Sequence, residues 1–200
     1  MRSDGVRAVA VTADRRLEGR TIVVGVCGSI AAYKAATLVR LLLREGADVY
    51  VAMTPAAARF VGPATFRALS RHPVVTDMWA PDSPWDEPHV ALGERADLYV
   101  VAPATADMLA RLAVGLADDV VCATALATRS PILLAPAMSD AMAESAAVRE
   151  NTERLRARGV RIAGPARGEL ASGKVGLGRM VEPDAIVAEI VELLGASAGR

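Results

Sequence analysis

One apolar run of the chain ends in glycine and hydroxyl residues that could hold an anionic ligand. The run Thr21–Val26 leads into residues 25–34, GVCGSIAAYK, where a glycine turn and Ser29 precede a helix-like stretch. A helix N-terminus offers backbone N–H donors to an anion, and Ser29 would add a hydroxyl. The spacing matches neither a Rossmann GxGxxG fingerprint nor a Walker A loop. An anion site and an ordinary strand–helix turn both remain open here.

Further candidate residues follow the next two strand-like runs. Thr54 and a proline follow Asp48–Met53, and the carboxyl ends of neighbouring parallel strands meet where phosphorylated ligands bind. Residues 101–107, VAPATAD, bring small side chains and one hydroxyl to a third strand–helix junction, where a flat ring could lie against backbone. Thr105 or Asp107 could equally cap the following helix, and the two roles are compatible.

His89 is the candidate acid–base residue. It follows an acidic loop at residues 82–87, and an imidazole near neutral pH suits proton abstraction from a thiol or carboxyl-bearing substrate. A lone histidine also fits a structural role. His72 precedes a proline in a polar loop and is expected at the surface. The glycine-rich residues 168–180 predict either a flexible loop or a flap over a site.

No metal or disulfide site is expected from the sequence. The acidic pairs at 86–87 and 118–119 have no histidine or third carboxylate at metal-ligand spacing, so we interpret them as a solvated loop and a helix-entry charge. Cys27 and Cys122 are isolated and give neither metal spacing nor a secreted disulfide framework.

Alternating strand-like and helix-like segments must position these residues. Continuous apolar strands between helices predict an α/β fold, a doubly wound parallel sheet covered on both faces, in one domain over residues 19–195. Residues 1–18 and 196–200 are expected to be a flexible segment and tail. The expected strands are 21–26, 48–53, 97–102, 131–135 and 160–163, and the expected helices are 30–45, a stretch from 55, 63–69, 106–113, 119–127, 145–158 and 183–194.

Composition narrows the function classes. Of 200 residues, 52% are hydrophobic, 4% aromatic and 23% charged, and 23 basic residues balance 23 acidic ones. A chain without basic excess is not expected to bind nucleic acid or an anionic membrane, and no apolar run is long enough for a membrane span. Residues 1–20 lack the apolar core of a signal peptide, so the cytoplasm is expected. A mean hydropathy of +0.30 without net charge predicts an oligomer.

Six segments, taken in order, resemble the flavoprotein family of cysteine decarboxylases, which act in coenzyme A biosynthesis and on lantibiotic peptides. Together they span almost all of residues 20–190. The segments are GVCGSIAAYK at 25–34, AMTPAAARFV at 52–61, HVALGERADLYVVAPATAD at 89–107, LADDVVCATALAT at 116–128, PAM at 136–138 and GKVGLGRM at 173–180.

The resemblance implies a flavodoxin-like sheet, a homotrimer or homododecamer, and FMN bound at a subunit interface. It assigns His89 as the catalytic histidine and places Ser172 at the flap position of a proton-donating cysteine. It implies that the FMN neighbours are Gly28, Ser29, Thr54, Ala104, Thr105, Ala106, Asp107 and Ala137, and that the substrate neighbours are Ser139, Met142 and Met180.

The implied chemistry is oxidation of a cysteine moiety to a thioaldehyde, which loses CO2 to give an enethiol. In the coenzyme A enzymes, reduced FMN then returns a hydride and the flap cysteine donates a proton. This sequence departs from the family at three positions, with Ser139 for asparagine, Ala143 for an aromatic residue and Ser172 for cysteine. A hydroxyl is a far weaker acid than a thiol, and Ser139 offers one donor where an amide offers two.

Three functions follow from the resemblance. The first is FMN-dependent decarboxylation of 4′-phosphopantothenoylcysteine to 4′-phosphopantetheine. The second is oxidative decarboxylation of a peptide C-terminal cysteine, ending at the enethiol. The third is an FMN-binding regulatory subunit without turnover. The expected partners are a small-molecule or peptide cysteine substrate and further copies of the chain.

Overall fold

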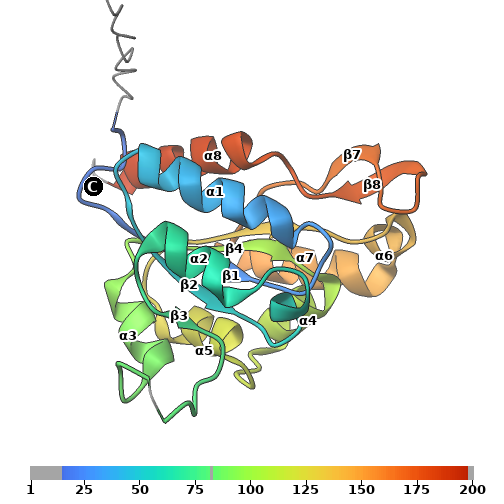
Figure 1. Cartoon of the computed structure of the whole chain (residues 1–200). Helices are drawn as coiled ribbons and strands as arrows, with labels where there is room; N and C mark the ends of the chain where they lie inside the picture. Colours follow the sequence, from blue (N-terminus) through green and yellow to red (C-terminus); the bar gives the residue numbers. More distant parts are fainter. Residues whose placement is uncertain (1–14, 82, 198–200) are drawn as a thin grey trace, which may run out of the picture.

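A parallel sheet forms the centre of the structure, a computed structural model that describes residues 15–81 and 83–197 (Figure 1). Its strand order is β3-β2-β1-β4-β5-β6, and every neighbouring pair is parallel. Without the two-residue edge strand β3, the order is that of a flavodoxin-like doubly wound sheet, as predicted. The strands are β1 (Thr21–Val26), β2 (Asp48–Met53), β3 (Val74–Val75), β4 (Leu98–Ala104), β5 (Ile132–Pro136) and β6 (Arg161–Ile162).

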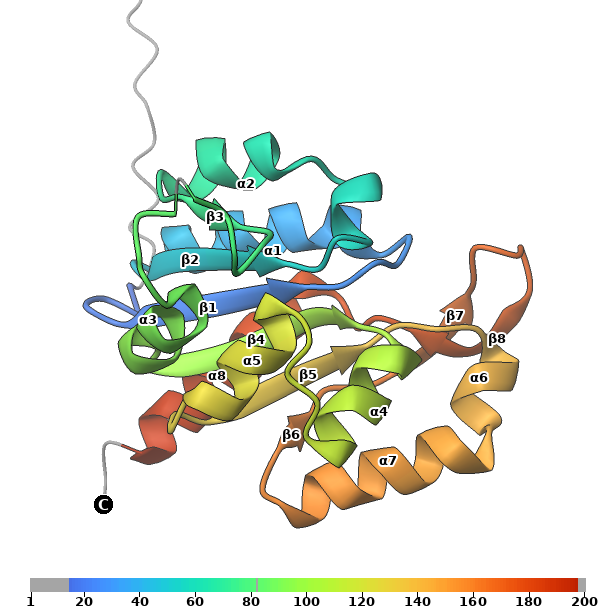
Figure 2. The ribbon, with the colours of Figure 1, turned by 90° about the horizontal axis from the view of Figure 1, so that it is seen from below.

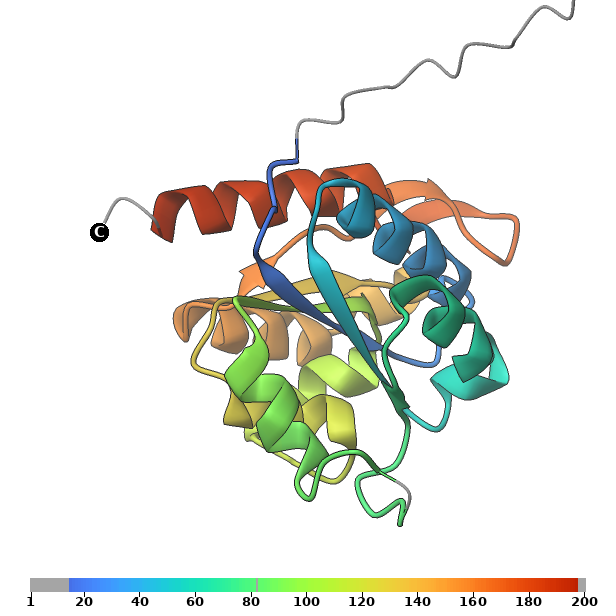
Figure 3. The same cartoon turned by 60° about the vertical axis from the view of Figure 1, so that its left-hand side comes forward.

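The strands are apolar on both faces because helices cover both faces of the sheet. Along β1, Val24 points into one core cluster and Val23 into the other, and all residues of β4 are buried. Three helices share the first cluster: α1 (Ala32–Arg44), α2 (Pro63–Ser70) and α8 (Pro183–Ser197). Four helices share the second: α3 (Pro88–Arg95), α4 (Ala106–Val114), α5 (Val120–Ala127) and α7 (Ala146–Ala157). Figure 3 shows α1 and α8 side by side on their face.

A β-hairpin forms at residues 166–179, where the sequence predicts a flexible loop or a flap. Strands β7 (Ala166–Glu169) and β8 (Val175–Arg179) pair antiparallel and project from one end of the domain, beside α6 (Asp140–Glu144), as Figure 2 shows. Met138 donates its N–H to the Gly178 carbonyl at 2.9 Å, so β8 lies directly against the segment that follows β5. Gly178 has φ 148°, and a Cβ there would meet the Met138 carbonyl. The glycines permit this close approach. Because glycine has a low strand propensity, the sequence did not predict β8 as a strand.

The other differences from the sequence prediction are local. Helices α3 and α6 and the short strand β3 were not expected. Of the segment 1–18 that was expected to be flexible, residues 1–14 lie outside the described residues. Within the described part, Leu17 is buried and donates its N–H to the Glu45 carbonyl at 2.9 Å. Helix α8 runs into the expected tail, through Ser197. None of the described helices is long and apolar enough to cross a membrane.

Both cysteines lie inside the core rather than at a surface. Cys27, after β1, and Cys122, on α5, are buried in the second cluster. Burial disfavours the charged thiolate, so it raises the pKa of Cys27 strongly and the pKa of Cys122 to about 12. Neither group is able to act as a thiol acid or nucleophile near neutral pH.

Alkylation tests the burial of these thiols. At pH 8 both groups remain protonated and out of reach, so the native protein should resist iodoacetamide for hours, as followed by intact mass. In guanidinium chloride both thiols should add the reagent within minutes, which serves as the control. Fast single or double labelling of the native protein would contradict the assignment.

Candidate active site

Three hydroxyl groups lie at the carboxyl edge of the sheet, because they follow the neighbouring strands β1, β2 and β4. Each accepts a hydrogen bond from a backbone N–H two or three residues later, which leaves its own O–H free to donate. Three free donors at one edge suit a phosphate or the polar rim of a ring. The pairs are Ser29 Oγ with the Ala31 N–H at 3.2 Å, Thr54 Oγ1 with the Ala57 N–H at 3.1 Å, and Thr105 Oγ1 with the Met108 N–H at 3.2 Å.

Small residues keep this edge open for a flat group. Ala104, Ala106 and Ala137 are buried, and the Ala137 N–H bonds the Ala104 carbonyl at 2.9 Å, which ties the ends of β4 and β5 together. A Cβ on Gly28 would lie 2.5 Å from the Cβ of Ala56, so the turns after β1 and β2 approach each other only with glycine there. The edge therefore combines small residues with donors, as a flavin site requires.

Asp107 is drawn away from this edge. Its carboxylate pairs with Arg111 Nε at 2.9 Å, one turn along α4, and its side chain is exposed. Arg111 Nη1 also contacts Asp118 at 3.0 Å and Asp119 at 3.2 Å. Potential ligand atoms of Asp118, Asp119 and Cys122 lie within 4.8 Å of one another, but Arg111 already compensates both carboxylates. Asp119 accepts from the Cys122 N–H at 2.9 Å as the cap of α5, the helix-entry role expected for it.

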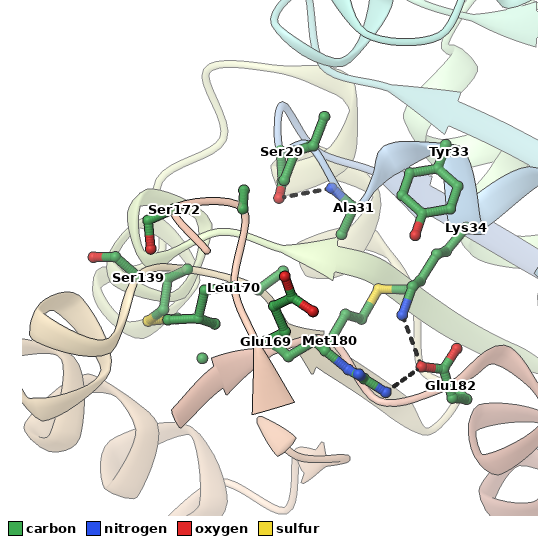
Figure 4. Close-up of a pocket in the computed structure, with 16 residues that line it drawn as sticks. Ser29, Ala31, Tyr33, Lys34, Ser139, Glu169, Leu170, Ser172, Met180 and Glu182 are labelled. Carbon is green, nitrogen blue, oxygen red and sulfur yellow. Dashed lines mark hydrogen bonds and ion pairs between the residues drawn. The ribbon is translucent and has the colours of Figure 1, made fainter. Parts of the chain in front are cut away.

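A pocket of about 640 Å³ lies between the turn after β1, the segment after β5 and the β7–β8 hairpin (Figure 4). It brings together predicted cofactor and substrate residues from segments far apart in the sequence. These are Ser29, Ala137, Ser139, Ser172 and Met180. Ser139 caps α6, accepting from the Met142 N–H at 3.4 Å, while the Met142 side chain is exposed and does not line the pocket.

Charged residues that sequence reasoning missed line the same pocket. Lys34 Nζ lies 2.9 Å from Glu182 Oε1, and Arg179 Nη2 lies 2.5 Å from the same oxygen. The hydrogen bond from Lys34 is the main cause of a lowered pKa of Glu182, and Arg179 adds to it. Glu169 also lines this wall. Lys34 and Arg179 lie in segments that carry the family resemblance, but Glu182, which contacts both, lies outside these segments. No sequence pattern predicts that α1 contacts the residue before α8.

His89 lies in a different pocket from Ser139 and Ser172. It is the second residue of α3 and lines a pocket of about 420 Å³ together with Trp79 and Leu126. Its Nδ1 atom is buried and has no hydrogen-bond partner among the described residues. Figure 2 shows α3 at the opposite end of the domain from the hairpin. One chain therefore does not bring the predicted catalytic histidine to the predicted substrate residues.

Comparisons with known proteins place these features in a family. The sequence profile of the Flavoprotein family matches residues 10–195. The coenzyme A biosynthesis bifunctional protein CoaBC of Escherichia coli strain K12 is 47% identical over 171 residues, 86% of this chain and 42% of that protein. CoaBC of Mycobacterium tuberculosis strain CDC 1551 / Oshkosh is 50% identical over 173 residues, 86% of this chain and 41% of that protein. The chain thus spans less than half the length of these curated relatives.

Solved structures agree with this placement. The FMN-dependent cysteine decarboxylase SpaF superposes with a TM-score of 0.77 at 34% identity, over 91% of this chain and 99% of SpaF. A cysteine-to-serine mutant of PPC decarboxylase, complexed with pantothenoylaminoethenethiol, superposes with a TM-score of 0.75 at 27% identity, over 86% of this chain and 96% of that one. Because the family profile covers nearly the whole described fold, the chain belongs to the flavoprotein family.

Proposed function

We propose that the protein is an FMN-dependent decarboxylase that converts 4′-phosphopantothenoylcysteine to 4′-phosphopantetheine. The observation that carries the proposal is the pocket beside the hairpin. It joins the predicted flavin neighbours Ser29 and Ala137 to the predicted substrate neighbours Ser139 and Met180. The names of the CoaBC relatives and of the cysteine decarboxylase structures support the reaction class.

The carboxyl edge of the sheet fits a flavin mononucleotide. Ser29 and Thr54, after β1 and β2, would donate to its phosphate, and Thr105 to its polar rim. Gly28, Ala104, Ala106 and Ala137 leave room for the flat ring, and the N–H groups of the first turn of α4, including that of Asp107, add donors. Bound FMN would supply a two-electron oxidation of the cysteine side chain.

The residues after β5 and on the hairpin would hold the substrate. The Ser139 oxygen accepts from the Met142 N–H, so its O–H is free to donate to the departing carboxylate. Ser172 lies at the hairpin tip over the same pocket, and buried Met180 forms part of its floor. In these positions Ser139 orients the carboxylate, and the hairpin limits access of water to the reacting carbon.

A second copy of the chain would complete the site with His89. Large apolar side chains are exposed beside both pockets, with Ile30 and Tyr33 each 60% exposed near the first and Trp79 85% exposed near the second. Assembly would cover these side chains, and a homotrimer or homododecamer would place the His89 pocket of one subunit against the hairpin pocket of the next. His89 would then accept a proton from the substrate during its oxidation.

Ser172 favours a second candidate, oxidative decarboxylation of a peptide C-terminal cysteine. The cysteine moiety would lose two electrons and two protons in an oxidation for which bound FMN supplies the acceptor, and would then lose CO2 and leave as an enethiol. Dioxygen would be the final oxidant and would become hydrogen peroxide. Of the two thiols in the chain, neither lines the pocket, so the acid that completes reduction in the coenzyme A enzymes is missing. The solved cysteine-to-serine PPC decarboxylase is likewise complexed with an enethiol.

Turnover by the reconstituted protein tests the reaction. Protein loaded with FMN should release CO2 from 4′-phosphopantothenoylcysteine, and His89→Asn should lower kcat by about 10²–10⁴-fold without changing the flavin spectrum. His72→Asn is the matched control, because His72 pairs with Asp48 at the start of β2 and lines neither pocket. Full turnover by His89→Asn would contradict its role. Bound flavin with no turnover on either substrate would instead identify a regulatory subunit.

Product mass tests the role of Ser172. The enethiol is two hydrogens lighter than the thiol, so mass spectrometry separates the two products. Because a thiol is the stronger acid, Ser172→Cys should raise the ratio of thiol to enethiol by about tenfold or more. Ser145→Cys, which adds a thiol outside the pocket, should leave the ratio unchanged. An equal ratio in Ser172→Cys and the wild type would show that Ser172 does not limit reduction.

A further inference from the structure

We propose that Lys34 and Arg179 form a phosphate-recognition site at one end of the hairpin pocket, selecting a phosphorylated substrate over a peptide. The inference rests on the proposed decarboxylation and adds to it the part of the substrate that sets specificity. The proposed site consists of Lys34 on α1, Arg179 on β8 and Glu182 before α8, to which the family resemblance assigns no role.

The two cations are held side by side by one carboxylate oxygen. Lys34 Nζ and Arg179 Nη2 both contact Glu182 Oε1, at 2.9 and 2.5 Å. In Figure 4 these contacts lie on one side of the pocket, while Ser139 and Ser172 lie on the other, with Leu170 and Met180 between them. The pocket thus has a hydroxyl end and a cationic end, with two apolar side chains and the carboxylate of Glu169 between them.

The cationic end has capacity for another anion. One carboxylate serves two cations, so the trio of Lys34, Arg179 and Glu182 carries one net positive charge. The Lys34 side chain is only 13% exposed, and Arg179 Nε is buried with no hydrogen-bond partner among the described residues. Glu169 lines the same wall with opposite charge, but it is exposed and more strongly screened by water. A phosphate monoester would accept charge-assisted hydrogen bonds from both cations.

A phosphate monoester could come from the substrate or from FMN, and the pocket favours the substrate. The pocket shares Ser29 with the proposed FMN phosphate site, but hairpin residues 169–172 and Ser139 also line it, and neither Thr54 nor Thr105 does. In 4′-phosphopantothenoylcysteine the phosphate and the cysteine carboxylate stand at opposite ends of the molecule. These ends match the cationic and hydroxyl ends of the pocket, whereas a peptide ending in cysteine has no phosphate to offer.

Paired substrates test the inference. The FMN-loaded protein should show kcat/KM at least about tenfold higher for 4′-phosphopantothenoylcysteine than for pantothenoylcysteine. Lys34→Met, which keeps the apolar stem, should remove most of that preference, because kcat/KM should fall much more for 4′-phosphopantothenoylcysteine than for pantothenoylcysteine. Lys174→Met is the matched control, since Lys174 is the other lysine of the chain, exposed on the hairpin and outside the pocket lining. Glu169→Gln should strengthen the preference.

Calorimetry gives a readout that does not need turnover. Lys34→Met should weaken binding of 4′-phosphopantetheine by about tenfold, while binding of pantetheine and of FMN stays unchanged. Weaker FMN binding with an unchanged substrate preference would assign the phosphate to the flavin and overturn the proposal. Equal use and equal binding of both substrate forms by the wild type would overturn it as well. Absence of turnover with a retained calorimetric preference would instead count against the proposed reaction alone.

Discussion

The parallel sheet, buried on both faces, is the constraint on which the rest of the structure depends. Because β1, β2, β4 and β5 run in the same direction, every turn that follows them reaches one edge. That edge collects the hydroxyls of Ser29, Thr54 and Thr105 and the small residues that keep it open. The same constraint keeps charge out of the buried parts of these strands, so the charged groups of the site come from α1, from the hairpin and from the segment before α8.

The docking of the hairpin against the segment after β5 is the second condition for a site. The bond from the Met138 N–H to the Gly178 carbonyl fixes β8 beside Ser139. It thereby places Ser172 above the pocket and Arg179 within reach of Glu182. Glycine at 178 makes this contact possible, since any Cβ would meet the Met138 carbonyl. The hairpin therefore gives the pocket a cover and part of its charged wall.

Much of this could be predicted from the sequence, where the signal is local. Apolar runs such as Thr21–Val26 and their following glycine turns predict the sheet and its ligand-binding edge, and the ordered motifs predict the family. The hairpin strands were not predicted because their glycines are required by a tertiary contact and have low strand propensity. The pair of Lys34 and Glu182 was missed because 148 residues separate its members. The separation of His89 from the hairpin pocket was not predicted, because the order of motifs along a sequence does not show whether one chain or two chains form a site.

In the proposed assembly each active site takes His89 from one subunit and the hairpin pocket from another. Subunit mixing tests it most directly. His89→Asn and Ser139→Asp should each be inactive alone, the second because it sets a like charge against the substrate carboxylate while remaining a good cap for α6. After dissociation and reassembly at equal amounts, about a quarter of the sites should contain both native residues, and activity should return to about that fraction of the wild-type rate. Mixed assemblies with no more activity than the two variants measured separately would contradict the account.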